Sequence, residues 1–111
     1  MIPDGAVERV QRWADDRVPE HIRDQIHIEL EVTDRTITIL ECRPPWHPDM
    51  GDEWTRFPIA RLRYTKTRDE WSLYWRDRNL EFHEYDLLDP SSNVHDLLAE
   101  IDSDPTSIFW G

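Results

Sequence analysis

The side chains best suited to chemistry lie in two stretches of the sequence, ECR at residues 41–43 and WSLYWRDRNLEFHEYD at residues 71–86. The longer stretch combines aromatic rings, fixed cations and a histidine that can exchange protons near neutral pH. Groups of this kind can orient an anionic ligand or carry a proton to it. An ordinary solvated face with cross-strand pairs is the alternative interpretation. The candidate binding residues in this stretch are Tyr74, Arg76, His83 and Tyr85.

Glu41 and Arg43 supply a second candidate site. A two-residue loop at Asp34-Arg35 would place Glu41 opposite Ile28, on the apolar side of a sheet. A carboxylate in that position requires a cationic partner or a shifted pKa. One interpretation is therefore a structural ion pair with an arginine. The other takes Glu41, Arg43 and a nearby carboxylate of the following loop, such as Asp49, Asp52 or Glu53, as the edge of a metal or anion site.

The second interpretation of Glu41 leads to an enzyme hypothesis, a metal-assisted hydrolase. A helix, strands that carry an acid and an acid-x-base pair, and a second helix form an order similar to that of the restriction-endonuclease-like nucleases. The pair here is Glu41-x-Arg43, with arginine where those nucleases usually have lysine. The upstream acid of such a site would be Glu29, Glu31 or Asp34.

Other catalytic and metal-binding motifs are missing from the sequence. Cys42 is the only cysteine, and although His27 is its expected cross-strand neighbour, nothing completes a nucleophilic site around them. Cys42 and His47 lack the second ligand pair of a structural zinc site. With three glycines in the chain, no phosphate-binding loop is present. Outside the hydrolase hypothesis, we expect no metal, no cofactor and no catalysis.

The charge of the chain limits its partners. Twenty-four acidic residues against thirteen basic ones give a net charge of −11, which repels nucleic-acid phosphates. We therefore expect no autonomous nucleic-acid binding, and a protein partner or a small ligand fits better. The compact basic exceptions are Arg61 with Arg63, and Arg76 with Arg78, and the first pair joins the candidate binding residues. An acidic member of a toxin–antitoxin or nucleic-acid-mimic pair is a further alternative.

The sequence also predicts where the protein works. A single cysteine excludes an internal disulfide, and no signal peptide is apparent, so we expect a cytoplasmic protein. No apolar stretch approaches the roughly 20 residues that cross a bilayer, so no membrane association is expected. We expect a monomer or a dimer.

Hydrophobic periodicity predicts the elements that must position these residues. Three- and four-residue spacing predicts an amphipathic helix over 4–18, which Pro19 ends. Alternation predicts strands, and Asp89-Pro90 followed by a four-residue apolar stripe predicts a second helix capped by Asp89. The predicted strands span 26–32, 36–42, 57–65, 71–77 and 79–86, and a proline-rich loop fills 43–54.

These elements predict one α+β domain over residues 1–111, with an antiparallel meander sheet and both helices on one of its faces. A two-residue turn at Arg78-Asn79 would give the last hairpin two distinct faces. The candidate binding residues of this hairpin would then lie on the outer face. The terminal IFW segment is expected to dock on the core. The core face of the hairpin would hold Trp71, Leu73, Trp75, Leu80 and Phe82.

Several segments in the same order resemble one family. The segments are RWADDRVPEHIRDQI, ECRPPW, PIARLRY, WSLYWRDRN and DPTSIFWG. Together they look like the uncharacterised bacterial family called domain of unknown function 3024. The resemblance implies a free-standing bacterial cytosolic protein of this length. It implies no activity, cofactor or catalytic residue.

Overall fold

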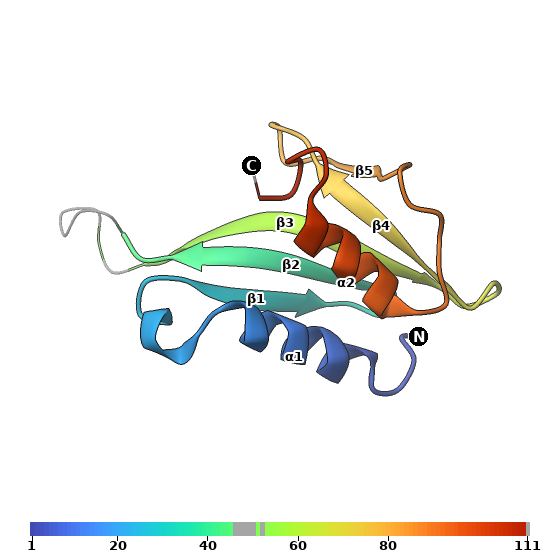
Figure 1. Cartoon of the computed structure of the whole chain (residues 1–111), viewed down its shortest axis with the longest axis horizontal. Coiled ribbons are helices and arrows are strands. Elements are labelled where there is room, and N and C mark those ends of the chain that lie inside the picture. The colour runs from blue at the N-terminus through green and yellow to red at the C-terminus, as the bar shows by residue number, and fades with distance from the viewer. Residues whose placement is uncertain (46–50, 52, 111) are drawn as a thin grey trace.

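The computed structural model describes residues 1–45, 51 and 53–110. Within them, a helix near each end of the chain flanks five antiparallel strands (Figure 1). The strands pair in their order along the chain as a meander, which confirms the predicted α+β fold class. The elements are α1 (Ala6–Arg17), a 3-10 helix (Glu20–Ile22), β1 (His27–Val32), β2 (Thr36–Arg43), β3 (Thr55–Thr65), β4 (Glu70–Arg76), β5 (Phe82–Glu84) and α2 (Val94–Ser103).

Both helices cover the same face of the sheet, as predicted (Figure 1). In α1, a four-residue spacing puts the small side chains Ala6, Val10 and Ala14 on one buried stripe. The sheet side chains that meet the helices are apolar and alternate along their strands. The resulting core joins α1 and α2 to Ile37, Ile39, Ala60, Leu62, Tyr64, Trp71 and Leu73. We call this the covered face and the opposite side the open face.

The first hairpin has the register that the sequence predicts. Val32 pairs with Ile37, and Ile28 pairs with Glu41. The turn is closed by the N–H of Thr33, which donates to the carbonyl of Thr36 at 2.9 Å, and by a contact of 2.7 Å between their hydroxyls. Because side chains alternate, this register sets both the apolar covered face and the polar open face of β1.

A β-bulge in β3 changes which of its side chains reach each face. Ile39 pairs with Ala60 and Leu40 with Pro58, so Ile59 is the extra residue. Proline has no N–H to give to a sheet, and a bulge is one of the few interior places that tolerate it. Arg56 thereby reaches the open face, which Arg61 shares, although the two lie five positions apart.

The hairpin between β4 and β5 does not have the predicted register. The N–H of Asp77 donates to the carbonyl of Glu81, so three residues rather than two connect the strands. Leu80, which was predicted in the core, adopts the left-handed region at φ 65° and is exposed. Arg76 consequently pairs with Phe82. Since an odd connection exchanges the faces of a strand, the predicted core position of Phe82 was wrong.

The C-terminal tail docks on the core as expected, but α2 begins later than predicted. The side chain of Asn93, not Asp89, caps α2 by accepting the N–H of His95. Phe109 is buried, and the indole N–H of Trp110 donates to the carbonyl of Ile101 at 3.0 Å. The aromatic tail therefore closes the core, as predicted. Among the described residues, no helix is long and apolar enough to span a bilayer.

Candidate functional site

The structure separates the eight candidate binding residues into three places. Arg61, Arg63 and Tyr74 lie together on the open face. Glu41, Arg43 and Arg76 line a groove at the end of the sheet, where the C-terminal tail docks. His83 and Tyr85 belong to neither set, because the hairpin register turns them toward the helices.

The first set lines a shallow cavity of about 280 Å³, which we call the arginine patch. Its cations come from the β1–β2 turn and from β3, and its aromatic rings from β4 and β5. The lining residues are Arg35, Thr36, Arg61, Arg63, Tyr74 and Phe82. Sequence reasoning missed Phe82 because a two-residue turn would have put it in the core. It missed Arg35 because a turn residue has no fixed face.

The cations of the arginine patch have no carboxylate partner among the described residues. The Nε of Arg61 donates to the hydroxyl of Thr38 at 2.8 Å, and its guanidinium lies 4.0 Å from the ring centroid of Phe82. Thr38 is buried, so this contact holds Arg61 in one orientation. Arginines without a carboxylate partner among the described residues keep donors that can bind an anion.

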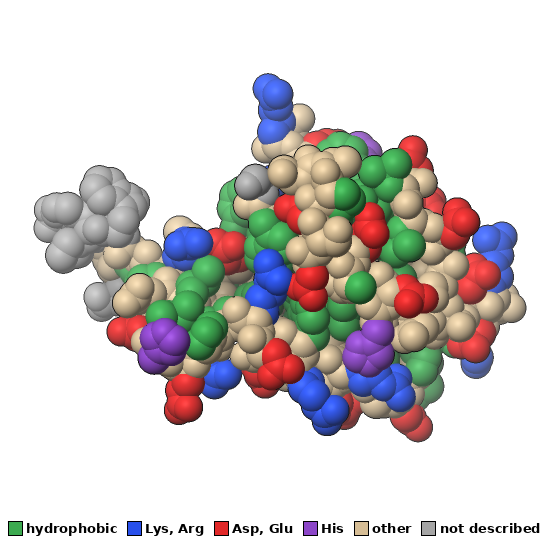
Figure 2. All heavy atoms as spheres, viewed as in Figure 1, with side chains coloured by type: hydrophobic (Ala, Val, Ile, Leu, Met, Phe, Trp, Pro, Cys, Tyr) green, Lys and Arg blue, Asp and Glu red, His purple; other side chains and the backbone are tan. Residues whose placement is uncertain are grey.

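Charges on the helix-covered side are arranged differently. Figure 2 shows acidic and basic side chains interspersed over this side. Arg17, for example, pairs with Asp102 and lies 4.1 Å from the ring centroid of Trp110. Such pairs neutralise each other locally, and exposed ones contribute little binding potential.

The end groove has a larger volume, about 470 Å³, but its charges are already satisfied. The Nε of Arg43 donates to Glu41 at 2.6 Å, and the Glu41 side chain is 19 % exposed. The Nε of Arg76 donates to the carbonyl of Pro58 at 2.6 Å, and its guanidinium lies 3.9 Å from the ring centroid of Phe57. The expected pairing of Glu41 with an arginine is therefore confirmed.

The hydrolase hypothesis needs a second carboxylate beside Glu41. Among the residues that the structure describes, no group of metal-ligating side chains includes Glu41. Glu53 is described and joins no such group, whereas His47, Asp49 and Asp52 lie outside the described residues. In the described part of the groove, Glu41 is therefore paired with Arg43 and belongs to no group of three or more metal-ligating side chains.

His83 and Tyr85 have structural partners. The Nε2 of His83 lies 2.7 Å from Asp77, and its ring lies 4.9 Å from that of Trp75. The hydrogen bond from His83 lowers the pKa of Asp77. Tyr85 is 3 % exposed and donates its hydroxyl to Glu100 at 2.7 Å. Burial, followed by the bond to Glu100, raises the pKa of Tyr85 to about 12. The expectation that Tyr85 lies on the outer face was wrong.

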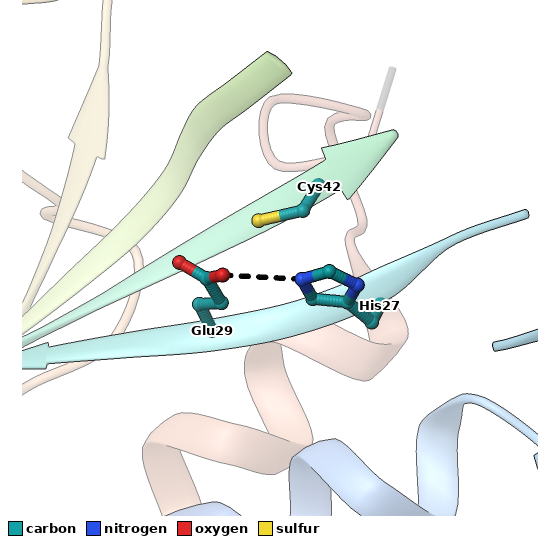
Figure 3. A group of neighbouring side chains, drawn as sticks. All are labelled: His27, Glu29 and Cys42. Atoms are coloured by element: carbon teal, nitrogen blue, oxygen red, sulfur yellow. Dashed lines mark hydrogen bonds and ion pairs between the residues drawn. The ribbon is translucent and has the colours of Figure 1, made fainter. Parts of the chain in front are cut away.

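A separate group of reactive side chains, outside the eight candidate residues, lies on the open face at the other end of the sheet from the arginine patch. His27, Glu29 and Cys42 each offer a ligand atom, and these atoms lie within 4.8 Å of one another (Figure 3). The hydrogen bond from His27 is the largest cause that lowers the pKa of Glu29, and the bond from Arg56 comes second. Burial, then the charge of Glu29, raises the pKa of the Cys42 thiol.

The sequence analysis predicted only part of this group, namely the pairing of His27 with Cys42. The predicted register puts His27 opposite Cys42, as the structure does. His27 and Glu29 are two positions apart, so they lie on the same face of a strand. This spacing was the signal that could have identified Glu29 as the third residue of the group. Because the Cys42 thiol is fully buried and its pKa is raised, it is poorly suited to act as a nucleophile.

The fold and these sites define an α+β protein with two helices on one face of a five-stranded meander and an arginine patch on the other. The chain belongs to the family described as domain of unknown function 3024 (DUF3024), whose model matches residues 3–111. This confirms the family that the sequence segments resemble. No curated protein and no solved structure matches the chain significantly.

Proposed function

We propose that this protein is a non-catalytic binding module for a small ligand that carries an anionic group and a flat ring, held at the arginine patch. One observation carries the proposal. Arg35, Arg61 and Arg63 lie around two aromatic rings and, within the described part of the chain, have no carboxylate partner.

The chemistry of the lining supports this ligand class. A guanidinium offers a planar fork of donors that matches a phosphate or a carboxylate. Tyr74 offers a ring on which a flat group can stack, and the guanidinium of Arg61 over Phe82 offers a flat cationic surface. Arg61 already lies over Phe82 and is fixed by Thr38, so part of the ordering cost is met before a ligand arrives.

The size and charge of the site favour a small ligand over a polyanion. A volume of about 280 Å³ is slightly below the roughly 300–1,000 Å³ of typical ligand sites, so only a small ligand fits. The net charge of −11 repels a long phosphate backbone but opposes a single anionic group much less. The lining contains no carboxylate, histidine or cysteine, which supports binding without catalysis.

The proposal includes a cytoplasmic location. A chain with one cysteine, Cys42, has no internal partner for a disulfide, and such chains are typical of reducing compartments. Phosphorylated and aromatic anions are common metabolites there, so the ligand class and the location agree.

Fragment binding tests the proposal. Adenosine monophosphate carries both an anion and a flat ring, whereas inorganic phosphate and adenosine carry one each. We expect nuclear magnetic resonance titration to show that the nucleotide binds more tightly than either fragment and shifts resonances of Tyr74 and Phe82. Benzoate serves as a second probe, since it combines a carboxylate with a ring.

Exposed arginines provide matched variants for this titration. Arg63→Gln should weaken binding about tenfold or more, because a charge-assisted hydrogen bond is lost. Arg12→Gln, on the exposed side of α1, should leave binding unchanged. The proposal is wrong if no probe moves the patch resonances, or if Arg63→Gln binds as tightly as the unsubstituted protein. Binding of an acidic peptide alone would point instead to a protein partner.

A further inference from the structure

Three side chains with different donor atoms converge on the open face, away from the arginine patch. His27 and Glu29 lie two positions apart on β1, and Cys42 is the cross-strand partner of His27 on β2. Figure 3 shows the imidazole and the carboxylate pointing toward each other, with the thiol beside them. Their ligand atoms lie within 4.8 Å of one another, and the Nε2 of His27 lies 3.1 Å from the Oε1 of Glu29.

We propose that His27, Glu29 and Cys42 bind a divalent cation of the zinc class. One nitrogen, one sulfur and one carboxylate oxygen form a donor set that suits Zn²⁺, and hard cations such as Mg²⁺ and Ca²⁺ prefer oxygen ligands only. Three protein ligands leave a fourth tetrahedral position for water or another ligand.

The required movement is small. Tetrahedral bonds of about 2.0 to 2.3 Å put ligand atoms roughly 3.3 to 3.8 Å apart. The three atoms therefore need to approach by about 1.5 Å at most from their separation of up to 4.8 Å. The side chains of His27 and Glu29 are only partly buried, at 35 % and 40 % exposure, which leaves a path for the ion.

Neighbouring residues already orient two of the ligands. The Nε of Arg56 donates to the Oε2 of Glu29 at 2.7 Å, which leaves Oε1 directed at His27. Arg56 also donates to Glu31 at 3.0 Å. The ring of Trp54 lies 4.7 Å from that of His27 and limits its rotation. Partners of this kind, which hold ligands in place, accompany most protein metal sites.

The charges balance when the cation binds. With a neutral thiol, the two carboxylates of Glu29 and Glu31 and the guanidinium of Arg56 leave one net negative charge. Zn²⁺ adds two positive charges, and Cys42 loses its thiol proton to solvent as the sulfur–zinc bond forms, which adds one negative charge. The loaded site is therefore neutral, and no redox step is involved.

A second group, formed by Asp77, Glu81 and His83, is a weaker candidate. The Oδ1 of Asp77 already accepts the N–H groups of Asn79 and Glu81, and its Oδ2 faces His83. Asp77 therefore stabilises the turn, and no thiolate is present to select zinc. This group serves as the internal control for the first.

Cobalt titration of the untagged, metal-free chain tests the site without any ligand at the arginine patch. Co²⁺ substitutes for Zn²⁺, and a cobalt–thiolate bond gives a strong charge-transfer absorption band. We expect the band to saturate at one Co²⁺ per chain and to disappear when one equivalent of Zn²⁺ is added. Failure of the band to form with the folded chain overturns the proposal.

Variants separate ligation from folding. Cys42→Ser should abolish the band, and His27→Gln and Glu29→Gln should each weaken Zn²⁺ binding about tenfold or more. His27→Gln and Glu29→Gln alter partly exposed side chains, so they remain informative if Cys42→Ser fails to fold. His83→Gln, in the other group, should bind as the unsubstituted protein does. Equal Zn²⁺ affinity in His27→Gln and the unsubstituted protein, or loss of binding only in His83→Gln, shows that the assigned ligands are wrong.

Discussion

The two faces of one sheet differ in how the same strands use their side chains. On the covered face, apolar residues such as Leu62 and Leu73 are buried against α1 and α2. On the open face, their neighbours Arg63 and Tyr74 line the arginine patch. Since neighbouring positions on a strand point to opposite faces, stability and binding are assigned to alternate residues of β3 and β4. Each function can therefore be changed by substitution with little effect on the other.

The largest expected effect on stability comes from alanine substitutions at two neighbouring positions of β3 that lie on opposite faces of the sheet. Leu62 is fully buried, so Leu62→Ala should lower the free energy of unfolding by about 3 kcal/mol, through lost burial and the cavity left behind. Arg63→Ala should change it by less than about 0.5 kcal/mol, because the side chain is exposed. Urea denaturation followed by tryptophan fluorescence measures both. Similar losses for the two variants would mean that the faces are not separated in this way.

The pH dependence of stability tests whether Tyr85, which directly follows β5, is buried on the covered face. Its folded-state pKa is raised to about 12, above the value of 10 for an exposed phenol. Its contribution to stability is therefore fully present below pH 10 and is lost as pH rises toward 12. Tyr85→Phe should lower the free energy of unfolding by about 1 kcal/mol at pH 8, because the bond to Glu100 is lost, and should reduce the loss above pH 10. Denaturation at pH 8 and pH 11 compares the two proteins. If Tyr85 were on the outer face, Tyr85→Phe and the unsubstituted protein would have the same free energy of unfolding at both pH values.

Asp77 tests the turn that decides which face Phe82 occupies. Its carboxylate accepts the N–H groups of Asn79 and Glu81 at 2.8 and 3.0 Å. Asp77→Ala should lower the free energy of unfolding, since two backbone donors lose their partner. The folded-state pKa of Asp77 is lowered, so this contribution is present above pH 4 and is lost as pH falls. Asp86→Ala is the control, because Asp86 is exposed and makes no side-chain hydrogen bond within the described residues. Equal stability of the two variants at pH 7 would contradict this role.

The predictability of the fold depends on how each register is set. The β1–β2 hairpin could be predicted because a two-residue turn and two alternating strands admit one pairing. The β4–β5 hairpin could not, because its three-residue turn puts Leu80 in the left-handed region, where leucine is uncommon. The bulge at Ile59 was signalled only by Pro58, a residue that a regular central strand would not contain.

The predictability of the candidate sites also depends on the strand registers. Arg61, Arg63 and Tyr74 could be predicted on one face from alternation alone, and the structure brings them together. Phe82 was assigned to the wrong face by the turn error. The group of His27, Glu29 and Cys42 required a correct register and the two-residue spacing at the same time. Function predicted from a sheet sequence is therefore only as reliable as the turns that set its registers.

Thr38 joins the two properties, stability and binding, that the two faces of the sheet otherwise separate. Thr38 is buried, and its hydroxyl accepts the Nε–H of Arg61 at 2.8 Å. Thr38→Val keeps the shape and removes the acceptor, so stability should change by less than about 1 kcal/mol. Arg61 loses its fixed orientation, and adenosine monophosphate should bind several-fold more weakly. If Thr38 acts only through Arg61, the double variant with Arg61→Gln should bind no more weakly than Arg61→Gln alone. Additive losses would instead mean that Thr38 supports the patch by some other contact.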